Sequence, residues 1–509
     1  MDQVLPQFSW VVTLTLIATI FFLSTTWKKI HGFLPPGPRQ WPLIGNLPQI
    51  FGKDLHVALT DLSKKYGDLV WMKLGSENVL VVNSMDATLD AFVKQGTTFA
   101  GRPSKRKSVE VMLGEGRDIV MNDGGAELKF HRKIVHSFLA AQRREGKYRL
   151  HNIMSREATS LVDSLETFGM DQQPFNPKMQ ISRVVANVLC QSVLNKRFET
   201  ADEKFLNQLR IVQDIVDNIE SFNIVDLIPW LEVLPIPSWM RFKRSLEKKE
   251  KWVNDFINER RENLSDWDEN DLLNIMLKLQ QEAIEENDEE KMHMLSDKTI
   301  GHIVYELFGG GIESTTLSIL WFLIYMIHNP ECQERAATEV LKVAEEQGGI
   351  YAPDKAYYPY LEASIKETLR LASVLPVGFP HRVTKDAKVG GYDVPKDTMV
   401  IMNIWSIHHD PNTWMDPFKF KPERFMEHGE KIYRRGYIPF GIGSRVCLGS
   451  TVAKMEIFMF CAHILSRYRI EAADPSKLPE LTGQAGLTMR PKPFDIVLRP
   501  RHIVNNSSH

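Results

Sequence analysis

The chain has 509 residues, of which 43% are hydrophobic and 25% charged, and this globular composition excludes a disordered or fibrous protein. Its 62 basic and 64 acidic residues give a net charge of −2, which excludes a strongly basic, global nucleic-acid binder. Its four cysteines have no paired spacing, which excludes a disulfide framework and a structural zinc module.

An apolar segment precedes the globular part. Residues 3–27 carry no charge, and about 20 helical residues span roughly 30 Å, the thickness of bilayer hydrocarbon. Asp2 near the start and the lack of a small-x-small cleavage site favour an uncleaved anchor over a signal peptide. Because Lys28 and Lys29 follow, the positive-inside rule places the rest of the chain in the cytoplasm. We expect an anchor over residues 1–29, a proline-rich hinge over 30–45 and one domain over 46–509.

Helical periodicity dominates the domain. It predicts helices over residues 55–66, 127–141, 152–167, 201–219 and 237–263. Short alternating runs predict strands over residues 69–74, 79–82, 388–391 and 399–402. The domain is therefore expected to be mainly α with a small β-rich region.

The longest helical pattern begins after Ser296, a plausible N-cap, and runs to about His328, before Asn329-Pro330. Its middle holds Gly309-Gly310-Gly311, and each glycine costs about 1 kcal/mol of helix stability relative to alanine. Either something approaches this backbone closely or the helix breaks here into two. Periodicity alone leaves both interpretations open.

A glycine-rich loop with a single cysteine, residues 439–449, is the most informative segment. Gly441 and Gly443 permit a tight turn, Arg445 lies two residues before the sulphur, and the pattern predicts a helix that opens at Cys447 and runs to about Arg467. A helix N-terminus and a nearby cation both favour thiolate over thiol, and following backbone N–H groups can donate to the sulphur. A thiolate without partner ligands fits one axial position on a haem iron.

The pattern Phe440-x-x-Gly443-x-Arg445-x-Cys447-x-Gly449 resembles the haem-ligand motif of the cytochrome P450 family. Glu367-Thr368-Leu369-Arg370 and Pro422-Glu423-Arg424-Phe425 resemble two further family segments in the right order. The resemblance covers nearly the whole chain and implies the helical P450 fold, haem b with iron ligated by Cys447, and a haem-thiolate monooxygenase.

Glu367 and Arg370 are spaced i,i+3, so they can form an ion pair on one helix face. The family resemblance implies that Arg424 completes a buried structural triad that holds the cysteine loop. It also implies haem contacts for Phe440, Gly441, Gly449, Arg445, His381 and Arg132, the last three at the propionates. The family usually has Trp where this chain has Leu128. His408-His409 lacks a further ligand at metal spacing and is expected to be structural.

Gly310-Gly311-Ile312-Glu313-Ser314-Thr315 resembles the oxygen-activation segment of the family. Glycine permits close approach to the backbone, and an acid beside an alcohol can relay protons. Glu313, Ser314 and Thr315 are therefore the catalytic candidates. The family pattern usually places threonine where Ser314 stands, and serine lacks the methyl group that restrains the hydroxyl rotamer.

The resemblance implies electron supply from NADPH through a flavoprotein reductase, with cytochrome b5 as a second candidate partner. Candidate docking cations are Lys129, Lys133, Arg434 and Arg435. The expected location is the endoplasmic reticulum membrane, with a single span, a cytoplasmic catalytic domain and no nucleic-acid partner. A small hydrophobic molecule is the expected substrate.

Two substrate classes remain open. Residues 223–231 and Phe99-Ala100-Gly101-Arg102-Pro103 resemble the steroid 17α-hydroxylase/17,20-lyase branch, whereas Gly486-Leu487-Thr488-Met489-Arg490 is more similar to aryl-hydrocarbon and drug-oxidising members. Ile211-Val212 stand where the steroid enzymes carry a polar residue for a steroid oxygen. A reductase-independent haem-thiolate isomerase or dehydratase and a gas-sensing haem protein are further alternatives, but neither needs the Glu313-Ser314 relay.

Overall fold

The computed structural model describes residues 33–501, apart from 76, 104–105, 114–117, 145–148, 169–172, 200–201, 221–223, 228, 263–270, 351–356 and 428–435; before residue 33 it describes only Thr13, Thr15 and Thr19. The predicted anchor, residues 1–29, therefore lies almost entirely outside the described residues.

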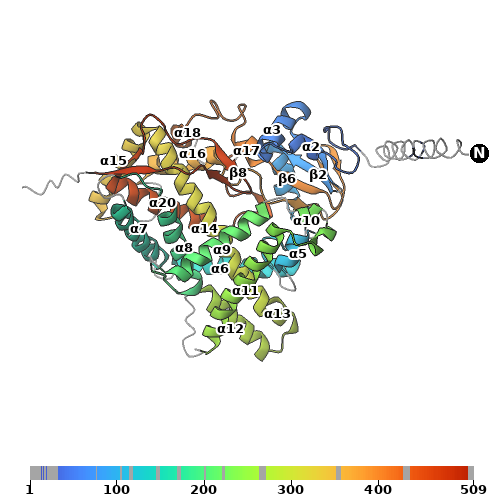
Figure 1. The fold of residues 1–509 in the computed structure, drawn as a ribbon, viewed down its shortest axis with the longest axis horizontal. Helices are drawn as coiled ribbons and strands as arrows, with labels where there is room; N and C mark the ends of the chain where they lie inside the picture. Colours follow the sequence, from blue (N-terminus) through green and yellow to red (C-terminus); the bar gives the residue numbers. More distant parts are fainter. Residues whose placement is uncertain are drawn as a thin grey trace, which may run out of the picture.

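Helices make up most of the described chain (Figure 1). In the first half they are α2 (Leu47–Ile50), α3 (Leu55–Tyr66), α4 (Met85–Thr88), the π-helix η1 (Leu89–Lys94), α5 (Lys107–Leu113), α6 (Gly125–Arg144), α7 (Arg149–Phe168), α8 (Lys178–Leu194), α9 (Glu203–Glu220), α10 (Ile224–Leu227), the 3-10 helix η3 (Pro229–Val233) and α11 (Pro237–Glu262). In the second half they are α12 (Leu272–Glu285), α13 (Glu289–Met294), α14 (Asp297–His328), α15 (Pro330–Gln347), α16 (Pro359–Ala372), α17 (Ile404–His408), α18 (Glu423–Glu427), the 3-10 helix η5 (Gly443–Arg445) and α20 (Ser450–Arg467).

One four-stranded sheet lies at an edge of the molecule beside α2 and α3 (Figure 1). In it, β1 (Leu69–Leu74) pairs antiparallel with β2 (Glu77–Val82), β2 pairs parallel with β6 (Met399–Met402), and β6 pairs antiparallel with β3 (His381–Arg382). Three antiparallel pairs complete the strands: β4 (Ala387–Val389) with β5 (Tyr392–Val394), β7 (Tyr468–Ala472) with β10 (Ile496–Pro500), and β8 (Gly483–Ala485) with β9 (Met489–Pro491).

Helix α14 is the central element of the helical part. The Ser296 hydroxyl accepts a hydrogen bond from the Thr299 N–H at 3.3 Å, so the predicted N-cap is confirmed. The helix is continuous through Gly309–Gly311, and the alternative of a break there is wrong. It packs against α8, α11, α16 and α20. Of the described helices, α14 alone is long and apolar enough to cross a membrane, but 72% of its most apolar window is buried, which identifies a core helix.

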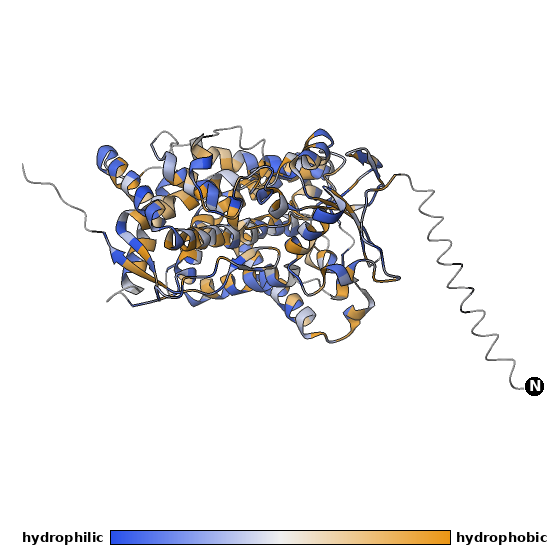
Figure 2. Cartoon of the chain, turned by 90° about the horizontal axis from the view of Figure 1, so that it is seen from above, coloured by the Kyte–Doolittle hydropathy of each residue, from blue (hydrophilic) through white to orange (hydrophobic). Residues whose placement is uncertain are grey.

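Peripheral helices carry both hydrophilic and hydrophobic residues, as Figure 2 shows. This is the pattern of amphipathic helices that turn an apolar stripe to the core. Their apolar faces join α14 in two large clusters of buried side chains, one against α7, α16 and α20, and one against α9, α11 and α12.

Most predicted elements are present, with ends that differ by up to three residues, and two of these differences have a local cause. The strand predicted over 388–391 ends at Val389, because Gly390 and Gly391 have φ of 56° and 84° and form the turn to β5. The helix expected to open at Cys447 begins at Ser450, with Gly449 as its N-cap.

Candidate functional site

The cysteine loop runs directly into the N-terminus of α20. The Cys447 N–H donates to the Phe440 oxygen at 3.0 Å, and the Gly441 N–H donates to the Ile438 oxygen at 3.0 Å. Gly443 has a φ of 80°, and a Cβ atom there would lie 2.1 Å from the Phe92 oxygen of η1. Only glycine permits both this conformation and this close packing of the loop on η1.

The Cys447 sulphur accepts hydrogen bonds from the backbone N–H groups of Gly449 and Ser450. Burial raises the pKa of the thiol, while these two N–H groups and the nearby Arg132 and Lys454 cations oppose the rise. Cys447 is nevertheless exposed as a residue, so the sulphur can be reached by a ligand. This donor set suits a thiolate that ligates a metal from one side.

Glu367, Arg370 and Arg424 form a buried ion-pair triad. The Arg370 Nε and Nη2 atoms donate to the two Glu367 carboxylate oxygens at 2.8 Å each, and the Arg424 Nε donates to Glu367 Oε1 at 2.9 Å. Glu367 and Arg370 have exposed side-chain fractions of 0%. The Lys421 N–H also donates to Glu367 Oε1, at 3.1 Å. Charges this deeply buried are tolerated only when they are paired in this way.

A chain of hydrogen bonds connects the triad to the cysteine loop. Arg370 Nη1 donates to the His408 oxygen at 2.7 Å, and the His408 Nε2 accepts from the Ile438 N–H at 3.0 Å, at the start of the loop. The other ring nitrogen of His408 contacts the Ser373 hydroxyl at 2.8 Å. One ring nitrogen of His408 thus holds the Ile438 backbone, and the other bonds the Ser373 side chain. Among the described residues, no group of three His, Cys, Asp or Glu side chains could hold a metal ion.

Four basic side chains converge near the cysteine loop: Arg102, Arg132, Arg445 and His381. Arg132 Nη2 donates to the Val446 oxygen at 3.0 Å, and Arg445 Nε donates to the Ala100 oxygen at 2.8 Å. Burial, with repulsion from Arg445, lowers the pKa of Arg102 to about 9, and burial with repulsion from Arg132 lowers the pKa of Arg445 to about 10. Burial, and then the charges of Arg102 and Arg445, hold the pKa of His381 well below its usual range. The cluster would be stabilised by an anion.

Residues 118–122 connect these cations to helix α14. Their carbonyls accept from arginines: Val120 from Arg102 Nε at 2.8 Å, and Ile119 from Arg445 Nη1 at 3.1 Å. Their N–H groups face the other way, and those of Ile119 and Val120 donate to the Glu306 carboxylate at 2.8 and 3.0 Å. The segment is thus held between two arginines and one helix acid.

Glu306 also shares a hydrogen bond with the Asp118 carboxyl group. Burial and then the Asp118 charge raise the pKa of Glu306 well above its usual range, so this buried pair retains a proton.

Sequence reasoning missed the roles of Arg102 and Glu306. The available signals were the placement of Arg102 in the Phe99–Pro103 motif and the spacing of Glu306, seven residues before Glu313 on the same helix face.

Helix α14 presents the oxygen-activation candidates. A Cβ atom at Gly311 would meet Leu189 of α8 at 2.7 Å, whereas Gly309 and Gly310 face open space. The Ser314 hydroxyl donates to the Gly310 oxygen at 2.7 Å and is accessible. The Thr315 hydroxyl is buried without a described partner. The Glu313 carboxylate is 9% exposed and is bound to Arg490. The geometry therefore favours Ser314 over Thr315 as the accessible hydroxyl beside the acid.

The residues present fit a haem. The Cys447 sulphur with its N–H donors could ligate the iron, the cationic cluster could hold the propionates, and the unfilled backbone at Gly309 and Gly310 leaves room beside α14. Of the predicted docking cations, Lys129 and Lys133 are exposed on α6, and Arg434 and Arg435 lie outside the described residues.

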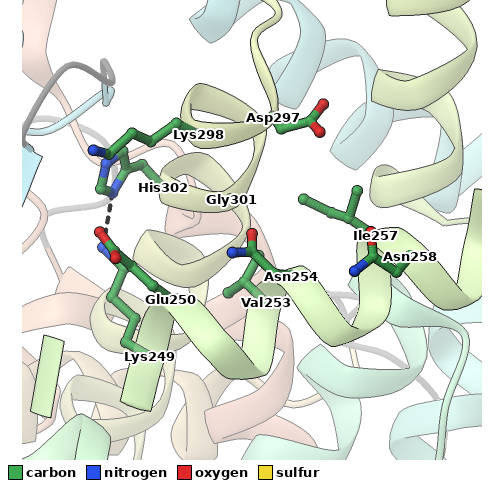
Figure 3. Close-up of a pocket in the computed structure, with 10 residues that line it drawn as sticks. All are labelled: Lys249, Glu250, Val253, Asn254, Ile257, Asn258, Asp297, Lys298, Gly301 and His302. Atoms are coloured by element: carbon green, nitrogen blue, oxygen red, sulfur yellow. Dashed lines mark hydrogen bonds between the residues drawn. The ribbon is translucent and has the colours of Figure 1, made fainter. Parts of the chain in front are cut away.

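A polar cavity of about 440 Å³ lies between α11 and α14 (Figure 3). Lys249 Nζ lies 2.7 Å from His302 Nδ1, and His302 Nε2 lies 2.9 Å from the Leu113 oxygen. Burial lowers the pKa of Lys249 to about 8 and, more than the neighbouring Lys249 charge, lowers that of His302 to about 3. None of the residues that line this cavity belongs to the cysteine loop or to the Glu313–Thr315 segment.

Comparisons with known proteins agree with this geometry. The cytochrome P450 family model matches residues 35–498. A steroid 17-alpha-hydroxylase/17,20 lyase of Ictalurus punctatus is 33% identical over 501 residues, covering 97% of each chain, and cytochrome P450 1A1 of Macaca mulatta is 32% identical over 464 residues, covering 90% of each. A solved zebrafish cytochrome P450 structure with progesterone matches with a TM-score of 0.76 at 29% identity, covering 87% of this chain and 99% of that one. The chain belongs to the cytochrome P450 family.

Proposed function

We propose that this P450 monooxygenase hydroxylates a steroid, in the manner of the 17α-hydroxylases, with electrons from NADPH delivered by a flavoprotein reductase. The observation that carries the substrate proposal is the near-complete coverage of relatives named steroid 17-alpha-hydroxylase/17,20 lyase, from fish, frog and bird. The zebrafish structure with progesterone supports the same substrate class.

In this proposal each half of the site has its own task. Haem with a cysteine-ligated iron supplies oxygen activation and insertion of one oxygen atom into a C–H bond. Cys447 would ligate the iron, and the N–H groups of Gly449 and Ser450 would moderate the charge on its sulphur. Arg102, Arg132, Arg445 and His381 would hold the propionates.

On the α14 side, the Glu313 carboxylate would take up a proton from solvent and pass it to the Ser314 hydroxyl oxygen, as that hydroxyl gives up its own proton toward the haem pocket. The hydroxyl now donates to the Gly310 oxygen, a bond that rotation about the Ser314 Cα–Cβ bond can exchange for another acceptor. A positioned general acid of this kind contributes about 10²–10⁴-fold.

The second candidate substrate class is planar aromatic hydrocarbons. Ile211 and Val212 of α9 are buried in the same apolar cluster as Phe308 and Ile312 of α14, and offer no polar partner for a steroid oxygen. The resemblance of residues 486–490 to aryl-hydrocarbon-oxidising members of the family favours the same alternative.

We further propose that the chain is anchored by residues 1–29 in the endoplasmic reticulum membrane, with its catalytic domain in the cytoplasm. The uncharged segment followed by Lys28 and Lys29 supports this orientation. Docking of the reductase, or of cytochrome b5, would use exposed cations such as Lys129 and Lys133 on α6.

A spectral binding titration of the holoenzyme tests the substrate proposal. Progesterone should shift the haem absorbance at lower concentrations than planar polycyclic aromatics do. With added reductase and NADPH, progesterone should yield a hydroxylated product. Tighter binding and faster oxidation of the aromatics would reject the steroid assignment in favour of the second candidate.

A further inference from the structure

Arg490 of β9 lies between two carboxylates that belong to two different helices. Its Nε atom lies 3.0 Å from Glu313 Oε1 of α14, and its Nη1 atom lies 2.7 Å from Asp217 Oδ1 of α9. Sequence reasoning identified Arg490 only as part of a family-like segment. In the structure it connects the candidate relay acid to a helix that is distant in sequence.

The backbone that carries Arg490 is fixed from two sides. The Met489 N–H donates to the Val374 oxygen at 2.8 Å, and the Met489 oxygen accepts from the Trp321 indole N–H of α14 at 2.8 Å. Strand β9 therefore cannot shift along α14 without breaking buried hydrogen bonds. The guanidinium extends from a rigid base, which suits a group that positions others.

The two ion pairs differ in burial. The Glu313 carboxylate is 9% exposed, and a charge that is so little hydrated needs a paired cation. The Asp217 carboxylate is 46% exposed and also accepts from Gln213 Nε2 of its own helix at 2.8 Å. Exposed pairs contribute little, so the Asp217 contact is the weaker of the two. Arg490 thus binds α14 firmly and α9 loosely.

We propose that Arg490 is a positioning residue that sets the orientation of Glu313 for proton transfer and, through Asp217, holds α9 against α14 beside the site. This inference rests on the proposed relay through Glu313 and Ser314. The two contacts have separable consequences. Loss of the Glu313 contact misplaces the acid and diverts electrons from product to hydrogen peroxide. Loss of the Asp217 contact loosens the packing of α9 and weakens substrate binding.

The test uses the full-length holoenzyme with reductase and measures product per NADPH, hydrogen peroxide per NADPH and the spectral dissociation constant of the substrate. Arg490→Met should lower product per NADPH about tenfold, because a displacement of about 1 Å can cost up to 100-fold. Arg490→Lys, which keeps the charge and most of the reach, should stay within about twofold of the wild type in this ratio. Arg469→Met on β7, an equally large change at an exposed arginine, should alter none of the three measurements.

A double-mutant cycle shows whether Arg490 acts through Glu313. In the Glu313→Gln background, Arg490→Met should cause no further loss of product per NADPH. Asp217→Asn should raise the substrate dissociation constant about two- to fivefold and leave product per NADPH unchanged.

Different outcomes would overturn different statements. If Glu313→Gln lowers product per NADPH and Arg490→Met does not, the role of Arg490 is rejected and the relay stands. If Glu313→Gln has no effect, the relay is rejected, and the role of Arg490 with it. Equal losses in Arg490→Met and Arg490→Lys, or losses that multiply in the double mutant, would show that the ion pair to Glu313 is not the cause. If Arg490→Met does not retain haem, the other two variants test the proposal. A large loss of product per NADPH in Arg490→Lys, or an unchanged dissociation constant in Asp217→Asn, would reject it.

Discussion

Glu367→Gln is expected to destabilise the protein far more than an ordinary ion-pair mutation. The substitution keeps the shape of the side chain but removes the charge that faces Arg370 and Arg424. Arg370, with an exposed side-chain fraction of 0%, would then be left as an uncompensated buried cation. Breaking a buried pair in this way costs about 3–5 kcal/mol, a large part of the roughly 5–15 kcal/mol that stabilises a typical domain.

Helix α16 also supplies a matched control. Glu362 pairs with Lys366 at 2.8 Å, one turn along the same helix, with side chains that are 16% and 23% exposed. Glu362→Gln should cost only about 0.2–1 kcal/mol. Urea unfolding followed by circular dichroism and by haem absorbance measures both variants.

The haem signal adds information about the cysteine loop. Because Arg370 and His408 connect the triad to Ile438, Glu367→Gln should release haem at lower urea concentrations than are needed to unfold the helices. Equal destabilisation by Glu367→Gln and Glu362→Gln would refute the reasoning. Simultaneous loss of haem and helix in Glu367→Gln would refute the connection to the loop.

Four further outcomes are expected. Cys447→Ala should abolish the red-shifted absorbance of the ferrous carbon monoxide complex that thiolate ligation produces, and an intact band would exclude this ligand. Ser314→Ala should lower product and raise hydrogen peroxide per NADPH, whereas Thr315→Val, at a buried hydroxyl, should not; the reverse result would transfer the relay to Thr315. Glu306→Leu removes the acceptor for the Ile119 and Val120 N–H groups and should weaken haem retention about tenfold. Transfer of haem to apomyoglobin measures this retention, and an unchanged rate of transfer would show that residues 118–122 do not support the cofactor. Burial and then the Arg370 charge lower the pKa of His409 to about 3, so below pH 6.5 the unfolded state takes up a proton that the folded state does not. The protein therefore loses about 2 kcal/mol of stability on going from neutral pH to pH 5. His409→Phe should remove this part of the acid sensitivity in urea unfolding, and an unchanged pH dependence would contradict the assignment.

Local features of the sequence determined much of the fold. The bounds of α3, β1 and β6 agree with the periodicity, and the Ser296 cap begins α14 where the sequence places it. These features depend on neighbouring residues only, so periodicity and capping suffice to predict them. The cysteine loop was recognisable for the same reason, because its glycines, arginine and cysteine lie within eleven residues.

Contacts between distant segments were decided only by the tertiary structure. Arg102 and Arg445 both donate hydrogen bonds to carbonyl groups within residues 118–122, and Arg490 binds Glu313, which lies 177 positions away in the chain. The unbroken course of α14 through three glycines also depends on its neighbours, since packing against α8 and α11 outweighs the low helix propensity. A sequence lists the charges, but the free energy of each buried charge depends on which partners the fold brings within hydrogen-bonding distance.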